Sequence, residues 1–402
     1  MGGSVPTGSD VGLAFSRGLW CGWTMEATKP SRRPSWVLRA TTTPGLESVA
    51  AREVREITGR TATAPTRGRL ELRGGGEEIF LLNYRSRSLH RIVLVLEECA
   101  FYGLEDLYAV VRNMPFPDLL DGSQSFAVRA SRHGDHTFTS MDVERTAGRA
   151  VLDAFVERGR GRPSVRLDDP DVPVLLEIHG DRLEVGLDTT GARSLHRRDY
   201  GAMSHPAPLK SSLAYALVRL SAWSPKECLL DPMCGSGTIC IEASLWANRV
   251  PNWFRKDLAF RRLGFLDQAR LREMQREVDE AVRQEPLDIR GSDISGKHVL
   301  RAAENARRAG AAVRVSRCDA ARACLDSDRI VTNPPFGRRM GSGSRVETLY
   351  RTFLDRLVEH RWKRAVILTG RPDLFPVLEG STRLDIRFGN LSAAVLILEG
   401  GG

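Results

Sequence analysis

The stretch DPMCGSGT, residues 231–238, decides the fold class of this chain. It follows the apolar run ECLL, so we expect Asp231 at the carboxyl end of a buried strand, with Gly235 and Gly237 opening the next helix. Glycines here allow the backbone to approach a nucleoside-like ligand closely, and the helix N-terminus favours a carboxylate. An isolated pair of glycines is more often a plain tight turn. A dinucleotide-binding loop would need a third Gly or Ala where Cys240 stands.

Strand-like runs alternate with helical patterns from this loop to the C-terminus. They are LDIRGSD (287–293), VRVSRCD (313–319), RIVTN (329–333), RAVILTG (364–370), LDIRFGN (384–390) and SAAVLILEG (392–400). With an apolar helix before the first strand, this order predicts a doubly wound α/β domain over residues 208–402. Asp293 ends one strand, where a carboxylate can accept hydrogen bonds from ribose hydroxyls, and Asp319 ends the next and can meet an adenine amino group. Each aspartate alone is more often a helix cap.

The sequence Asn333-Pro334-Pro335-Phe336 at the end of the fourth strand is the sharpest signal in the chain. An exocyclic base amine is a poor nucleophile because its lone pair is delocalised into the ring. The side-chain carbonyl of Asn333 and the backbone carbonyl of Pro334 can each accept one of its N–H groups and orient the nitrogen for in-line transfer. The diprolyl unit would hold these acceptors rigidly, and Phe336 can stack on a flipped base. The competing interpretation is a turn with a core phenylalanine.

The first half of the chain divides into three predicted parts and a connector. Residues 1–35, rich in Gly, Ser, Pro and Arg, are expected to be a disordered leader that lacks the features of a signal peptide. Residues 36–98 and 99–190 each alternate strand and helix patterns, which predicts two small α+β modules. Residues 191–207 have the composition of a basic, irregular connector.

Basic residues in these parts are candidate phosphate contacts. The net charge of +9 commonly accompanies polyanionic partners, although many basic proteins bind none. The candidates are Arg129, Arg132, His133, Arg197, Arg198 and Arg338. For each of them a solvated charged face is an equally good interpretation. The insertion at residues 248–268 is basic and aromatic. Its Trp253, Phe254 and Arg255 either border a groove that binds the polyanion or, as is more common, pack against the sheet of the predicted α/β domain.

Several classes of protein are disfavoured by composition. No run approaches the roughly 18 apolar residues that a membrane-spanning helix needs. The seven cysteines are scattered and contain no CxxC pair, so the sequence predicts neither a zinc site nor a secreted disulfide framework. We therefore expect a metal-free protein of a reducing cytoplasm, which acts without a membrane.

The order of these motifs resembles that of the class I S-adenosylmethionine-dependent methyltransferases, with DPMCGSGT as the cofactor loop and NPPF as the amine-methylating signature. The front half is similar to THUMP-containing RNA methyltransferases in TPGLESVAAREV, SFAVRASRHGDHTFTSMDVERTAGRAV and VPVLLEIHGDRLEVGLDTTG. The resemblance implies a ferredoxin-like module over residues 36–98, a THUMP RNA-binding domain over 99–190 and a Rossmann-like catalytic domain over 208–402.

The resemblance also implies S-adenosyl-L-methionine as cofactor and a role for each matching residue. The cofactor would be bound by Asp231, Pro232, Met233, Cys234, Gly235, Ser236, Gly237, Asp293, Ile294, Asp319, Ala320 and Asn333. Asn333, Pro334 and Phe336 would be catalytic, without a covalent intermediate and without an assigned general base. Cys234 would pack rather than react. Carbon methylation is disfavoured because Phe336 occupies the place of the cysteine nucleophile that it needs.

Within this group the chain most resembles the enzymes that make N2-methylguanosine at position 6 of the tRNA acceptor stem. A ribosomal RNA guanine-N2 methyltransferase is the first alternative, and methylation of a protein glutamine or of DNA adenine is less favoured because neither needs an RNA grip. A non-catalytic RNA-binding protein and a nicotinamide-dependent oxidoreductase are further alternatives. We expect a monomer, and a small activating subunit is an alternative that the sequence leaves open.

Overall fold

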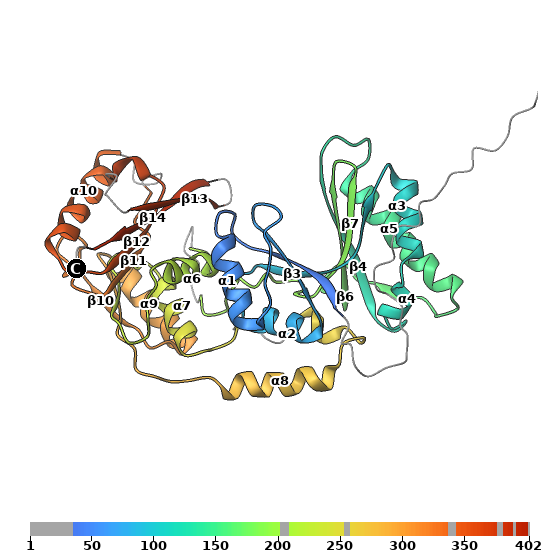
Figure 1. The fold of residues 1–402 in the computed structure, drawn as a ribbon, viewed down its shortest axis with the longest axis horizontal. Helices are drawn as coiled ribbons and strands as arrows, with labels where there is room; N and C mark the ends of the chain where they lie inside the picture. Colours follow the sequence, from blue (N-terminus) through green and yellow to red (C-terminus); the bar gives the residue numbers. More distant parts are fainter. Residues whose placement is uncertain are drawn as a thin grey trace, which may run out of the picture.

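The computed structural model describes residues 35–201, 209–252, 258–336, 343–375, 381–388 and 391–400 of an elongated molecule (Figure 1). The predicted leader at residues 1–35 lies outside this part except for its last residue. The described residues form two seven-stranded sheets, one in each half of the chain. Among the described helices, none has the length and apolar character that crossing a membrane requires.

The front half contains β1 to β7 and α1 to α5. Their bounds are β1 Trp36–Thr41, α1 Glu47–Thr58, β2 Arg69–Gly74, α2 Gly76–Arg85, β3 Arg91–Ala100, α3 Leu104–Asn113, α4 Phe116–Leu119, β4 Ser125–His133, α5 Ser140–Glu157, β5 Ser164–Val165, β6 Val172–His179 and β7 Arg182–Asp188. Local signals account for several boundaries, since Thr139 and Asp142 form a capping box at the start of α5 and Gly59 ends α1 in the left-handed region.

The two predicted front modules share one sheet, with the strand order β2-β1-β3-β7-β6-β4-β5. Strand β3 pairs antiparallel with β7 from Val93, opposite Asp188, to Ala100, opposite Arg182. The predicted module boundary between residues 98 and 99 therefore falls inside β3. Because hydrogen bonds join β3 to β7 on both sides of this boundary, the two predicted front modules form one continuous sheet.

The second half begins with α6 and contains the second sheet. Its elements are α6 Ser211–Leu220, β8 Leu229–Asp231, α7 Thr238–Ala247, η1 Ala259–Arg262, α8 Gln268–Glu280, β9 Ile289–Asp293, α9 Gly296–Ala309, β10 Arg314–Arg317, β11 Arg329–Thr332, α10 Gly343–Glu359, β12 Arg364–Thr369, η2 Pro372–Leu374, β13 Thr382–Phe388 and β14 Leu391–Glu399.

The strand order of this sheet is β10-β9-β8-β11-β12-β14-β13. The first five strands in this order are parallel, and β14 is antiparallel to both of its neighbours. The predicted doubly wound α/β fold is confirmed. The strand order reverses between β8 and β11, which are adjacent although about a hundred residues apart in sequence. In folds of this class the ligand crevice lies outside the carboxyl ends of the strands at such a reversal.

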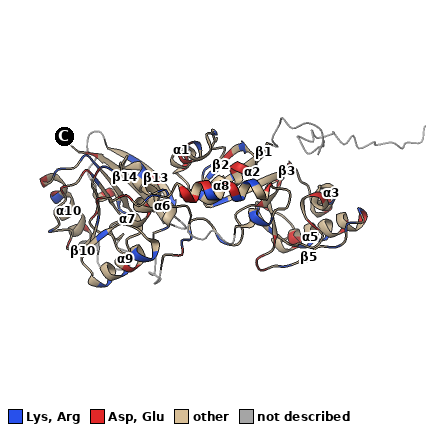
Figure 2. Ribbon diagram, turned by 90° about the horizontal axis from the view of Figure 1, so that it is seen from below, with Lys and Arg blue, Asp and Glu red and all other residues tan. Residues whose placement is uncertain are grey.

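The insertion between α7 and β9 returns to the front half. Phe260, Leu263 and Leu271 are buried in the same apolar core as the strands of the first sheet. Helix α8 packs on α2, and the two helices lie together in Figures 1 and 2. The described residues of this segment therefore pack in the front half, although it is inserted in the sequence of the second half. Residues 253–257, which include the candidates Trp253, Phe254 and Arg255, lie outside the described part.

Candidate active site

Asp231 ends β8 at the reversal point of the second sheet and is 1% exposed. Its carboxylate accepts hydrogen bonds from Thr332 Oγ1 at 2.8 Å and from the backbone N–H of Met233 at 3.2 Å. Burial raises the pKa of Asp231 to about 7. The two hydrogen bonds act in the opposite direction and lower this pKa, and the nearby charge of Asp293 makes a smaller contribution that raises it. Asp231 thus joins the cofactor-loop motif to the strand that leads into NPPF.

The loop after Asp231 has the backbone that its glycines predict. Gly235 and Gly237 have φ values of 53° and 80°, in the region that favours glycine. A Cβ on Gly237 would lie 3.0 Å from the Cβ of Ala302 on α9, so this glycine also permits the close packing of two helices. The backbone N–H of Gly235 donates to Asp293 Oδ2 at 3.1 Å, which ties the loop to the end of β9.

Cys234 lies inside this loop and is 7% exposed. Its backbone N–H donates to the carbonyl of Ser292 at 2.8 Å. Burial raises the pKa of its thiol far above the ordinary value, and the charges of Asp231 and Asp293 add to the effect. A neutral, buried thiol is a poor nucleophile, which agrees with the prediction that Cys234 packs rather than reacts.

The other predicted cofactor residues lie at the adjacent strand ends. Asp293 Oδ1 accepts from the backbone N–H of Ser295 at 2.9 Å and lies 3.2 Å from His298 Nδ1. Ile294 beside it is 61% exposed, an apolar side chain directly after the end of β9. Asp319 follows β10 and accepts from the N–H of Ala321 at 3.0 Å in a turn. No helix begins in the described residues between β10 and β11, so the helix-cap interpretation of Asp319 is wrong. Ala320 is buried.

Asn333, Pro334 and Phe336 lie directly after β11, the strand that pairs with β8 and whose last residue, Thr332, donates to Asp231. The side-chain oxygen of Asn333 is buried and has no hydrogen-bond partner among the described residues. Buried polar atoms are almost always paired, so an unpaired acceptor is a mark of a site that awaits a donor. Phe336 packs over Gly370, where a Cβ would lie 2.8 Å from its ring.

Tyr350 is a residue that sequence reasoning missed. It is 1% exposed on α10, accepts a hydrogen bond from Thr369 Oγ1 at 3.1 Å and donates to the carbonyl of Pro335 at 3.4 Å. The Tyr350 hydroxyl therefore links the end of β12 to the backbone of the diprolyl segment. Its spacing on α10 is that of an ordinary core residue, so nothing in the local sequence distinguishes it.

The candidate phosphate contacts are scattered over two regions. Arg129 and His133 are exposed on one face of β4, where Arg129 donates to the carbonyl of Leu167 at 2.6 Å and His133 stacks on His179. Arg132 points to the other face and donates to the carbonyl of Gly134 at 3.3 Å. Arg197 in the connector is exposed. Arg338 lies outside the described residues.

The prediction that Arg198 contacts phosphates is wrong. Its side chain is 2% exposed and lies 3.1 Å from the carboxylate of Glu242 on α7. A guanidinium that is buried against a carboxylate is not available to a polyanion. Sequence alone shows only a basic connector, and the carboxylate that pairs with Arg198 lies 44 residues away.

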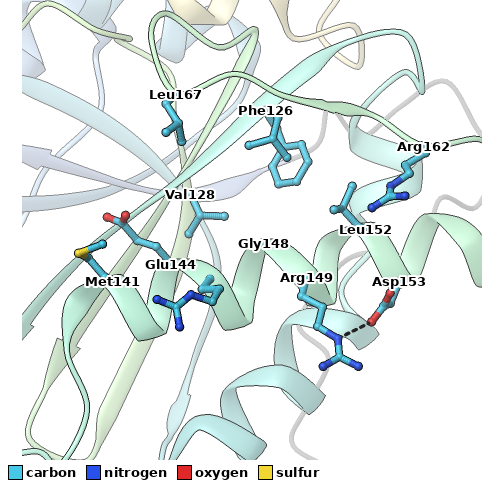
Figure 3. A pocket seen from close by; sticks show the side chains of 12 residues that line it. Phe126, Val128, Met141, Glu144, Gly148, Arg149, Leu152, Asp153, Arg162 and Leu167 are labelled. Atoms are coloured by element: carbon cyan, nitrogen blue, oxygen red, sulfur yellow. Dashed lines mark ion pairs between the residues drawn. The ribbon is translucent and has the colours of Figure 1, made fainter.

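A cavity of about 520 Å³ lies in the front half between β4, α5 and the residues around β5 (Figure 3). Its walls combine apolar side chains with three arginines and two carboxylates, those of Glu144 and Asp153. Phe126, Val128 and Leu152 belong to the apolar part, and Arg145, Arg149 and Arg162 supply charge. Arg149 is partly neutralised by an ion pair with Asp153 at 3.4 Å. Such a surface suits a ligand with flat apolar faces and negative charge, such as an unpaired nucleotide.

One group of potential metal ligands occurs in the described part of the chain, at Cys324, Asp326 and His360. Cys324 and Asp326 are exposed, and both nitrogens of His360 already have partners, since Nδ1 lies 3.3 Å from Asp326 and Nε2 lies 2.6 Å from an Arg356 nitrogen. The guanidinium at Nε2 opposes a cation there. We assign no metal to this group.

Three family models match successive parts of the chain. Residues 38–93 match the RlmL ferredoxin-like domain, residues 102–188 match the THUMP domain, and residues 198–384 match the RMKL-like methyltransferase domain. A putative methyltransferase, SMU.472, solved in complex with SAH, superposes with a TM-score of 0.82 at 24% identity, covering 92% of this chain and all of that one. These matches define a class I methyltransferase fold behind a THUMP domain.

Curated relatives show which group of methyltransferases the chain is similar to. The tRNA (guanine(6)-N2)-methyltransferase of Archaeoglobus fulgidus is 39% identical over 81% of each chain, and that of Methanocaldococcus jannaschii is 34% identical over 89% of this chain and 98% of its own. The ribosomal RNA large subunit methyltransferase K/L of Syntrophotalea carbinolica is 33% identical over 83% of this chain but only 49% of its own length. The chain belongs to the family of THUMP-domain methyltransferases that includes the tRNA (guanine(6)-N2)-methyltransferases.

Proposed function

We propose that this protein transfers a methyl group from S-adenosyl-L-methionine to the exocyclic N2 of a guanosine in RNA, with guanosine 6 of the tRNA acceptor stem as its target. The observation that carries the proposal is the buried side-chain oxygen of Asn333, which has no partner among the described residues and directly follows β11, the strand next to β8 at the reversal point of the sheet. The names of the two archaeal relatives support the choice of nucleotide.

The residues at the crevice suit S-adenosyl-L-methionine. The left-handed turns at Gly235 and Gly237 leave the start of α7 open to a carboxylate. Asp293, at the end of the adjacent strand β9, suits ribose hydroxyls, and the exposed Ile294 suits an apolar contact with a purine ring. The cofactor supplies an electrophilic methyl group on a sulfonium, so neither a metal nor a protein nucleophile is needed.

The chain's own part in the reaction is orientation of the amine. Asn333 accepts one N–H of the target amine through its side-chain oxygen, and the backbone carbonyl of Pro334 accepts the other. Phe336 stacks on the extruded base, with its ring braced against Gly370. The nitrogen becomes acidic once it is alkylated, so its proton can leave afterwards without a strong general base.

The front half supplies the RNA-binding surface. The cavity beside α5 suits an unpaired nucleotide of an RNA end, and the exposed Arg129 and Arg197 suit phosphates. Because these contacts carry no base-specific information, they would position the RNA and leave the choice of base to the catalytic crevice. We also propose that the protein acts as a monomer in a reducing cytoplasm, which agrees with free thiols on all described cysteines.

A ribosomal RNA substrate is the second candidate, because the K/L methyltransferase matches 83% of this chain, between the 81% and 89% that the two tRNA enzymes match. The decisive experiment supplies labelled S-adenosylmethionine and unmodified tRNA or ribosomal RNA in separate reactions, followed by digestion to nucleosides and mass spectrometry. We expect N2-methylguanosine in tRNA alone, at acceptor-stem position 6 after fragment mapping. Label confined to ribosomal RNA would favour the second candidate, and label on another atom would overturn the proposed chemistry.

A further inference from the structure

One face of α9 lies against the loop between β8 and α7. His298, Ala302 and Asn305 are spaced four and three residues apart on this helix, so they lie on the same side of it. Helices α7 and α9 lie side by side (Figure 1). The partners of the three residues at the strand ends are Asp293, Gly237 and Ser236, in that order. We call these three residues the α9 face.

Asn305 holds one peptide unit of the loop. It is 4% exposed, and its Nδ2 donates to the carbonyl of Ser236 at 3.1 Å. The N–H group of the same peptide unit belongs to Gly237 and donates to the carbonyl of Cys234 at 2.8 Å. Glycine alone does not fix such a unit, because it adopts positive and negative φ about equally readily. The side chain of Asn305 therefore supplies a constraint that the loop itself lacks.

The same segment presents hydrogen-bond donors to the start of α7. The backbone N–H groups of Ser236 and Thr238 have no partner among the described residues. The carbonyls of Ser236 and Gly237 lie between these two donors in the chain, and both are engaged, by Asn305 and by the N–H of Ile241. A segment that offers donors while its acceptors are engaged suits an anionic group, and the helix dipole of α7 acts in the same direction.

His298 lies at the other end of the α9 face. Its Nδ1 is 3.2 Å from Asp293 Oδ1, and the Asp293 side chain is 12% exposed. The same carboxylate accepts from the backbone N–H groups of Gly235 and Ser295 at 3.1 Å and 2.9 Å. His298 is thus the one side chain from α9 in a set of three contacts that fix the direction of the Asp293 carboxylate.

We infer that Asn305 and His298 are positioning residues with separate tasks, Asn305 for the carboxylate of S-adenosyl-L-methionine and His298 for its ribose. Asn305 acts through the carbonyl of Ser236, and His298 acts through Asp293, so neither needs to touch the ligand. This inference rests on the proposed function, since it assigns residues of this chain to two parts of the cofactor named there.

The test compares the binding of two nucleosides by calorimetry. S-adenosyl-L-homocysteine carries both the ribose and the amino-acid carboxylate, whereas 5′-methylthioadenosine carries the ribose and lacks the amino acid. A damaged fold lowers the number of binding sites for both nucleosides alike, but loss of an anion contact weakens only the first. The variants are Asn305→Ala, Asn305→Asp and His298→Ala. Asn83→Ala, which removes a buried amide in the front half, is the matched control.

For Asn305→Ala we expect the Kd for S-adenosyl-L-homocysteine to rise about tenfold, as for loss of about one hydrogen bond, while the Kd for 5′-methylthioadenosine stays within about twofold. Asn305→Asp should raise the first Kd further, because its carboxylate repels both the carbonyl of Ser236 and the carboxylate of the ligand. His298→Ala should raise both Kd values by the same factor, about threefold, because both nucleosides carry the ribose. The control should leave both values within about twofold of wild type.

Equal factors for the two nucleosides in the Asn305 variants would overturn the task of Asn305, and unchanged Kd values in His298→Ala would overturn that of His298. Aspartate keeps the shape of the asparagine side chain, so Asn305→Asp decides the matter if Asn305→Ala does not fold. If wild type binds S-adenosyl-L-homocysteine but methylates no RNA, the proposed function fails while the Kd values still judge the inference. A wild-type protein that binds neither nucleoside would overturn both.

Discussion

Asn333 presents a buried side-chain oxygen that lacks a hydrogen-bond partner among the described residues. Substitution by Ala removes this acceptor and leaves the loop around Gly235 untouched. We expect the turnover rate to fall about 10²- to 10³-fold, as for removal of one hydrogen-bonding group from a preorganised site, while cofactor affinity stays within a few-fold. Calorimetry with the cofactor and single-turnover rates with RNA check this. Lost cofactor binding with unchanged turnover per bound site would contradict the role.

Tyr350 acts one step further from the reacting atoms. Tyr350→Phe removes the hydroxyl between Thr369 and the carbonyl of Pro335 but keeps the ring. We expect the turnover rate to drop about three- to tenfold with the KM for cofactor unchanged, because a hydrogen bond of about 1 kcal/mol holds the diprolyl turn in place. Tyr108→Phe, which removes a hydroxyl in the THUMP domain, is the control. Equal effects of the two substitutions would show that Tyr350 has no special influence on the site.

At the scale of elements, the seam between β3 and β7 depends on Gly186. A Cβ there would lie 2.5 Å from the side chain of Val93 and 2.8 Å from the carbonyl of Leu94. We expect Gly186→Ala to lower the free energy of unfolding by about 1 to 3 kcal/mol through overpacking, measured by denaturant titration.

Gly148 on α5 is the matched control, because a Cβ at that position meets nothing within 4 Å. Gly148→Ala should raise the free energy of unfolding by about 0.5 to 1 kcal/mol, since alanine restricts the unfolded chain and favours the helix. If Gly186→Ala were as well tolerated as Gly148→Ala, the close pairing of β3 with β7 would be in doubt.

At the scale of the whole molecule, the front half, connector and catalytic half meet at two histidines. His90 precedes β3 and contacts Ser212 of α6 at 2.9 Å, and its ring centre lies 4.8 Å from that of His196 in the connector. Burial lowers the pKa of His90 to about 3 and that of His196 to about 4, and neighbouring positive charges act in the same direction. Both rings are therefore neutral in the folded protein at neutral pH.

This junction predicts sensitivity to acid. Because the folded pKa of His90 lies below the unfolded value of 6.5, its contribution to stability is complete above pH 6.5 and is lost as the pH falls toward 3. The slope approaches about 1.4 kcal/mol per pH unit for one such histidine. We expect His90→Gln to show a shallower decline of unfolding free energy between pH 7 and pH 5 than wild type. Parallel curves for the two proteins would refute the assignment.

The sequence by itself determined the alternation of strands and helices, the α/β class and the grouping of the motif residues at the strand ends, although it did not reveal α3 or α4. These follow from local information, because the period of apolar residues marks strands and helices, and glycines and prolines mark the loops at strand ends. Asp231, Gly235, Gly237 and Asp293 lie together because the carboxyl ends of parallel strands meet at one edge.

The tertiary structure alone decided the features that depend on distant partners. The sequence predicts Arg198 to be a basic surface residue, whereas the structure buries it against the carboxylate of Glu242. Arg87 contacts the same carboxylate although it lies 155 residues away in the sequence. By sequence, the segment around Phe260 belongs to the predicted catalytic domain, but the structure packs it in the front core. By sequence, Tyr350 is an ordinary core residue, but in the structure its hydroxyl contacts Thr369 and the carbonyl of Pro335. Periodicity tells which side chains are buried but not which segment buries them, because pairing between remote segments depends on the packing of the whole chain.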